Sequence, residues 1–131
     1  MIGIDTNVLV RYLAQDDAKQ SAAASRLFQS LSPASPAFVS QIVLAETIWV
    51  LESRYDAGAE RVGQVIETLL RTDALQVERA DVVWRALRRF REAQGDFPDA
   101  LVTELALAAG CKQVYSFDRG AVKRSGMTPL E

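Results

Sequence analysis

Short apolar runs alternate with longer segments whose apolar residues recur at helical spacing. The runs predict strands at 2–5, 37–39, 75–77, 113–117 and 127–130. The longer segments predict helices at 7–13, 18–31, 41–54, 59–71, 81–93 and 98–109, with a helical turn at 119–123. Strands alternating with helices are typical of α/β proteins with parallel sheets. We therefore expect a three-layer α/β/α sandwich with a central, mostly parallel sheet of four to five strands.

Proline and glycine residues mark where these segments end. Pro33 and Pro36 precede the second strand, Gly58 and Gly95 separate helices, and Gly110 stands where a helix C-terminus favours glycine. No repeat, low-complexity tract or linker interrupts the pattern. The sequence therefore predicts a single domain over residues 1–131.

Composition excludes several classes of chemistry. The 131 residues include one Cys and no His, at a net charge of −2. An internal disulfide, a His-dependent nucleophile and a His-ligated zinc site are therefore impossible. No apolar stretch reaches the length of a membrane span and no signal peptide is evident, so we expect a cytoplasmic protein that does not bind membranes.

Two aspartates stand at strand ends. Asp5 follows the first predicted strand and Asp118 the fourth. Ligands of open parallel sheets gather beyond the carboxyl ends of strands. Aspartate is equally a preferred helix N-cap, so a capping role and a site role both remain open for each.

Two further acids stand on helices. Glu46 lies in a nearly continuous apolar run, so we expect it to be buried and to need a cation, although pairing with Arg11 or an exposed position is an alternative. Asp96 and Asp99 fit a capping box at a helix start. We expect Asp96 to cap the helix and Asp99 to point into a cleft.

The four acids Asp5, Glu46, Asp99 and Asp118 carry more information together than singly. Several carboxylates placed close together repel one another and need a neutralising cation. Oxygen ligands without His or Cys suit Mg²⁺ or Mn²⁺, ions that polarise phosphoryl oxygens and lower the pKa of a bound water. The sequence therefore favours phosphodiester hydrolysis.

Four motifs in this order resemble the PIN-domain nucleases, most closely the VapC-type toxins. The resemblance spans nearly the whole chain and rests on Ile4–Leu9, Ser40 followed by Glu46, Asp96–Val102, and Ser116–Arg119. It implies a PIN-like fold and a metal-dependent endoribonuclease acting on single-stranded RNA. It also implies a homodimer and a small antitoxin protein whose tail covers the active-site groove.

The same resemblance implies roles for individual residues. Asp5, Glu46, Asp99 and Asp118 would form the acidic metal cluster, and the polar supports would be Thr6, Asn7 and Ser116. Asp96 falls beside the family's acidic position, so its role as cap or ligand stays open. Independently of the resemblance, the candidate RNA contacts are three basic residues near the proposed cleft, Arg119, Lys123 and Arg124.

Other interpretations remain. The arginines at 85, 88, 89 and 91 are interpreted as a solvated helix face with aromatic neighbours turned inward. A haloacid-dehalogenase phosphatase would need an acid at position 7, which is Asn7. A non-catalytic acidic-pocket module that binds metal, and a PIN-like nuclease of RNA processing without an antitoxin, are the remaining alternatives.

Overall fold

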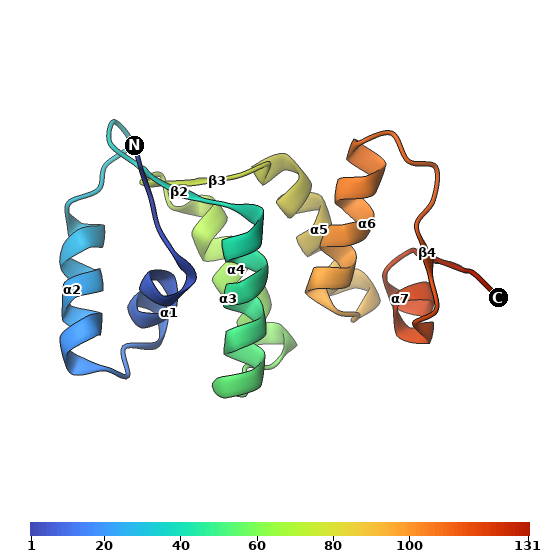
Figure 1. Cartoon of the computed structure of the whole chain (residues 1–131), viewed down its shortest axis with the longest axis horizontal. Coiled ribbons are helices and arrows are strands. Elements are labelled where there is room, and N and C mark those ends of the chain that lie inside the picture. The colour runs from blue at the N-terminus through green and yellow to red at the C-terminus, as the bar shows by residue number, and fades with distance from the viewer. The chain divides into compact units, whose positions relative to one another are not determined.

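The computed structural model describes all 131 residues and divides them into two compact units (Figure 1). The first unit contains residues 1–58 and 68–78, and the second contains residues 59–67 and 79–131. Helix α4, Ala59–Arg71, begins in the second unit and ends in the first. Each unit has its own parallel sheet and its own helices, and each is described below by itself.

The first unit is built on a three-stranded parallel sheet. Its strands are β1 (Ile2–Gly3), β2 (Ala37–Val39) and β3 (Leu75–Val77), in the order β1-β2-β3. Helix α1 (Thr6–Ala14) packs against α2 (Ala18–Gln29) and α3 (Gln41–Arg54). Leu9 and Ile48 are completely buried in this core, so α1 and α3 are fixed beside the end of β1.

The second unit is built on a helix pair. Helix α5 (Ala80–Ala93) packs against α6 (Phe97–Ala108), and the rings of Phe90 and Phe97 meet edge to face with centroids 5.9 Å apart. The parallel strands β4 (Tyr115–Ser116) and β5 (Thr128–Pro129) flank α7, Arg119–Arg124. This unit therefore presents the starts of α6 and α7 as two helix N-termini that carry acids.

The structure confirms the order and type of every predicted element. Helices α3 and α4 and strands β2 and β3 have the predicted bounds, whereas β1, β4 and β5 are shorter than predicted. The five strands form one sheet of three and one of two, and every strand pair is parallel. None of the helices is both long and apolar enough to cross a membrane.

Candidate functional site

Asp5 stands at the junction between β1 and α1. It is the N-cap of α1, and its Oδ1 accepts a hydrogen bond from the backbone N–H of Thr6 at 2.8 Å. Buried Ile4 precedes it, and Asp5 itself is exposed to solvent. The capping role is confirmed, and the outer carboxylate oxygen stays available to a ligand.

Glu46 is exposed, so the prediction that it is buried is wrong. Helix α3 packs inward through a stripe that includes Val43, Leu44 and Ile48 and leaves its opposite face uncovered. Ile42 is 73% exposed on that face. The Glu46 Oε1 accepts a hydrogen bond from the Thr6 hydroxyl at 3.0 Å and does not pair with Arg11. The long apolar run therefore did not imply burial on every side.

Three residues of the predicted site share one pocket with Glu46. The pocket is about 250 Å³ and is lined by Asp5, Thr6, Asn7, Val10, Arg11, Glu46, Val50, Arg54 and Tyr55. Its acidic side chains come from the end of β1 and from α3, 41 positions apart in the sequence for Asp5 and Glu46. Fold topology therefore brings the first two predicted acids together.

Arg11 organises one wall of this pocket through a polar network that the sequence did not reveal. Its Nη1 donates to Asp16 at 3.2 Å and to the Tyr55 hydroxyl at 3.1 Å, and its Nε donates to Gln20 at 2.7 Å. The Tyr55 hydroxyl donates to Asp16 at 2.6 Å. The hydrogen bond from Tyr55 is the largest cause that lowers the pKa of Asp16, and a backbone hydrogen bond and the charge of Arg11 lower it further.

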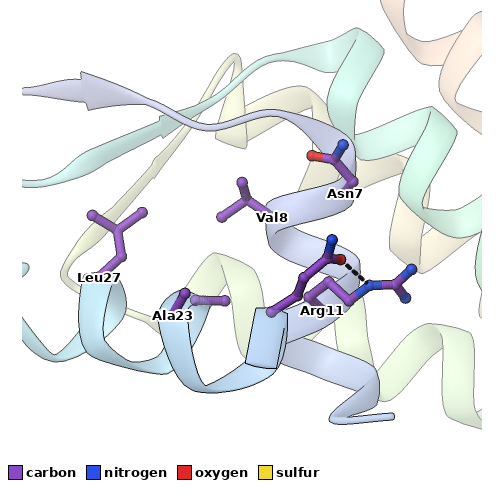
Figure 2. Close-up of a pocket in the computed structure, with 7 residues that line it drawn as sticks. Asn7, Val8, Arg11, Ala23 and Leu27 are labelled. Atoms are coloured by element: carbon purple, nitrogen blue, oxygen red, sulfur yellow. Dashed lines mark hydrogen bonds between the residues drawn. The ribbon is translucent and has the colours of Figure 1, made fainter. Parts of the chain in front are cut away.

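A second pocket of about 340 Å³ lies between α1 and α2 and shares Asn7 and Arg11 with the first (Figure 2). Figure 2 shows Val8 facing Ala23 and Leu27, with the Arg11–Gln20 hydrogen bond at one end. Nearby, the rings of Tyr12 and Phe28 stack with centroids 3.8 Å apart. This pocket is mostly apolar and contains no acid, so it is not the place where a cation would bind.

The second unit carries the other predicted acids, at the start of α6. Asp96 caps α6, with its Oδ1 accepting from the backbone N–H of Asp99 at 2.9 Å. Partial burial, followed by the charges of Asp96 and Asp118, raises the pKa of Asp99. The capping prediction for Asp96 is confirmed, and Asp99 lies in a locally negative environment.

Asp118 is held by its neighbours at the start of α7. Its Oδ1 accepts from the backbone N–H of Ala121 at 2.9 Å, and its own N–H donates to the Ser116 hydroxyl at 2.9 Å. Ser116 therefore does support the Asp118 loop. All three candidate RNA contacts, Arg119, Lys123 and Arg124, are exposed, and Arg124 also donates to the Ala93 carbonyl at 3.1 Å.

Thr103 ties α6 to the end of α7. It is 2% exposed, and its hydroxyl donates to the Ser125 carbonyl at 2.7 Å. Thr103 stands one helical turn after Asp99, and Ser125 immediately follows the helix that Asp118 caps. This hydrogen bond therefore links the two acid-bearing segments of the second unit.

Three of the four arginines of α5 form structural ion pairs. Arg89 binds the buried carboxylate of Glu104 at 2.8 Å, Arg85 approaches the same group at 3.6 Å, and Arg91 binds Glu67 at 2.6 Å. Phe90 is buried, which agrees with the interpretation of α5 as a solvated face with inward aromatics. Sequence reasoning missed Glu104, although an acid in an apolar helix was a usable signal.

The predicted acids thus fall into two pairs. Asp5 and Glu46 share a pocket in the first unit, and in the second unit the charge of Asp118 contributes to raising the pKa of Asp99. Within neither unit do three acidic or sulfur side chains come together as metal ligands. The four-acid cluster stays a prediction.

The chain is similar to known proteins over most of its length. The PIN-domain family model matches residues 2–126. A VapC ribonuclease of Aquifex aeolicus (strain VF5) is 31% identical over 117 residues, which cover 88% of this chain and 86% of that protein. The crystal structure of VapC20 of Mycobacterium tuberculosis, described as a sarcin–ricin loop cleaving toxin, covers 100% of this chain and 99% of its own, with 26% identity and a TM-score of 0.46.

The family match extends over nearly the whole chain and includes all four predicted acids. It also confirms the prediction of an α/β, PIN-like fold. The chain therefore belongs to the PIN-domain family, and within it to the VapC type.

Proposed function

We propose that the protein is a metal-dependent endoribonuclease that cleaves single-stranded RNA and acts as the toxin of a toxin–antitoxin pair. The observation that carries this proposal is the pocket in which Asp5, Thr6 and Glu46 meet, with Thr6 donating to Glu46 at 3.0 Å. The VapC ribonuclease relative supports the activity. A small antitoxin and a homodimer are part of the same proposal.

The residues present fit a hard divalent cation. Every donor in the two acid pairs is an oxygen, and oxygen ligands suit Mg²⁺ and Mn²⁺. Partial burial, followed by the charges of Asp96 and Asp118, raises the pKa of Asp99, and a cation would relieve the repulsion between these carboxylates. Asp5, Glu46, Asp99 and Asp118 would hold the ion. When bound, it polarises the phosphoryl oxygens and lowers the pKa of a bound water.

The polar supports would orient these carboxylates and the RNA. The Thr6 N–H fixes one oxygen of Asp5 while the Thr6 hydroxyl fixes one oxygen of Glu46. Asn7 is exposed in the first turn of α1, where its side-chain amide could donate to a phosphate oxygen. Ser116 fixes the backbone at Asp118 in the same way.

Amide substitution of the acids tests the activity. Asp5→Asn or Asp99→Asn should lower the rate of RNA cleavage about 100-fold or more, because even residues that only orient metal ligands contribute 10–100-fold. Exposed Asp73 in the first unit provides the control, and Asp73→Asn should cleave normally. Cleavage should stop in EDTA and return with Mg²⁺ or Mn²⁺. Folded Asp5→Asn or Asp99→Asn proteins with near-normal rates would contradict the proposal.

Expression of the chain without a partner tests the toxin assignment. The wild-type protein should arrest growth, and the folded Asp99→Asn variant should not. Co-expression of the short reading frame next to the gene should restore growth if it encodes the antitoxin. RNA cleavage in vitro without growth arrest would instead indicate a PIN-like nuclease of RNA processing.

Basic residues of α7 are proposed to guide the RNA. Lys123 is exposed and makes no contact that its loss would disrupt, whereas Arg124 also supports the Ala93 carbonyl. Lys123→Glu should therefore weaken RNA binding and reduce the slope of log Kd against log salt by about 0.7 or more. An unchanged slope, measured by fluorescence anisotropy, would show that Lys123 does not contact the RNA.

A further inference from the structure

The pocket that contains Asp5 and Glu46 has a basic end that the proposed chemistry does not use. Along α3, Glu46, Val50 and Arg54 line it at intervals of four residues, so they share one face of the helix. Eight residues of helix rise about 12 Å. The pocket therefore runs from carboxylates at one end to a guanidinium at the other.

Arg11 and Tyr55 also line this basic end, but their polar atoms are already engaged. Arg11 donates to Asp16, Gln20 and Tyr55, and the Tyr55 hydroxyl in turn donates to Asp16. An anion that bound Arg11 would compete with Asp16 for the same guanidinium. These two residues therefore form a fixed wall.

Arg54 is the cation of this pocket that remains free. It stands in the last turn of α3 and is exposed, and no carboxylate of its unit pairs with it. Val50, half-buried, separates it from Glu46 and gives the middle of the pocket an apolar surface. A guanidinium presents a planar fork of donors that matches two phosphate oxygens.

We propose that Arg54 binds a phosphate of the RNA backbone that flanks the scissile phosphate. This inference rests on the proposed nuclease function, because it assumes that the reacting phosphate lies at the Asp5 and Glu46 end. RNA is a chain of regularly spaced anions, so a strand held at one end of the pocket places a second phosphate toward the other. Arg54 is thus a positioning residue, which binds substrate without touching the reacting bond.

The test compares Arg54→Gln with a matched control. Arg26 also lies in the last turn of a helix of the first unit and is exposed, but it lies outside the pocket. Arg26→Gln therefore removes the same charge and the same interaction with a helix dipole. The probe is a fluorescein-labelled pool of 20-nucleotide single-stranded RNA. Binding is measured by anisotropy in EDTA, and cleavage is measured with Mg²⁺. For single strands, each lost phosphate contact should reduce the slope of log Kd against log salt by about 0.7.

Arg54→Gln should raise both Kd and KM about five- to tenfold, with a smaller change in kcat, and should reduce the salt slope by about 0.7. Arg54→Lys should recover part of the loss because it keeps the charge but not the fork. Arg26→Gln should match the wild type.

Equal Kd values and salt slopes for Arg54→Gln and Arg26→Gln would overturn the inference. A fall in kcat at unchanged KM and Kd would also overturn it, since Arg54 would then act on the reaction and not on substrate binding. The inference fails equally if Arg54→Gln weakens binding of a protein partner but not of RNA. If the wild-type protein binds the RNA pool but does not cleave it, the nuclease proposal is rejected. The anisotropy comparison would then still test whether Arg54 contributes to RNA binding.

Discussion

The hydrogen bond between Thr103 and Ser125 offers a quantitative test of how the second unit is held together. Thr103 is 2% exposed, and its hydroxyl donates to the Ser125 carbonyl at 2.7 Å. Thr103→Val replaces the hydroxyl with a methyl group of similar size. The substitution therefore leaves the packing nearly unchanged and removes the partner of the Ser125 carbonyl.

The cost follows from the unpaired carbonyl. A buried acceptor left without its donor destabilises the folded state by about 1–3 kcal/mol. For a chain of this length, each kcal/mol lowers the Tm by roughly 3–6 °C, between the values for smaller and larger domains. We expect Thr103→Val to unfold at correspondingly lower urea concentration with an unchanged m-value.

Ser125→Ala is the matched control. The Ser125 hydroxyl is buried and has no hydrogen-bond partner, so its removal should be neutral or slightly stabilising. Urea unfolding followed by circular dichroism measures both variants. A Thr103→Val protein within about 0.5 kcal/mol of the wild type would refute the reasoning, since that is the range of ordinary surface substitutions. A Ser125→Ala protein as unstable as Thr103→Val would refute it as well.

Two further predictions concern ionised groups. The hydrogen bond from Tyr55 lowers the pKa of Asp16 in the folded protein below its ordinary value of 3.8. The ionised carboxylate therefore stabilises the fold at pH values above 3.8, and this stabilisation is lost as the pH falls through the pKa of the folded protein. Asp16→Asn should therefore have a lower Tm than the wild type at pH 7, and this difference should shrink as the pH falls below 3.8; a difference that stays constant into acid would contradict this. Arg89→Met should cost about 2 kcal/mol in urea unfolding, because it strips the closest partner from buried Glu104. Arg85→Met should cost less than about 1 kcal/mol, because the contact between Arg85 and Glu104 is longer and more exposed. Equal losses of stability in the Arg85 and Arg89 variants would contradict this prediction.

Local chemistry explains why the element boundaries could be predicted. Asp96 and Pro98 mark the start of α6, and the structure shows the cap from the Asp96 Oδ1. Gly110 has φ of +100° just after α6, a conformation that glycine adopts without strain. Such signals act over a few residues, so the ends of helices can be predicted from the sequence.

Exposure of Glu46 could not be predicted because it depends on which face of α3 its neighbours cover. The run around Glu46 is apolar, but Ile42 and Trp49 lie with it on the uncovered face, at 73% and 61% exposure. The argument that an acid among apolar residues must be buried holds for Glu104, which is 7% exposed. The partner of Glu104, Arg89, lies on another helix. The pairing therefore depends on how α5 and α6 pack, which the sequence alone does not show.

The aspartates at the helix starts divide their two oxygens between separate tasks. In Asp5 and Asp118 the Oδ1 atom accepts a backbone N–H, which sets the orientation of the whole group before any ligand arrives. Oδ2 accepts no such bond, and because the group is already held through Oδ1, little rotational freedom remains to be lost when an ion binds. Asparagine retains the accepting oxygen and neutralises only the other, whereas alanine abolishes both. Amide and alanine variants of the same position can therefore separate what a carboxylate does for the fold from what it does for chemistry.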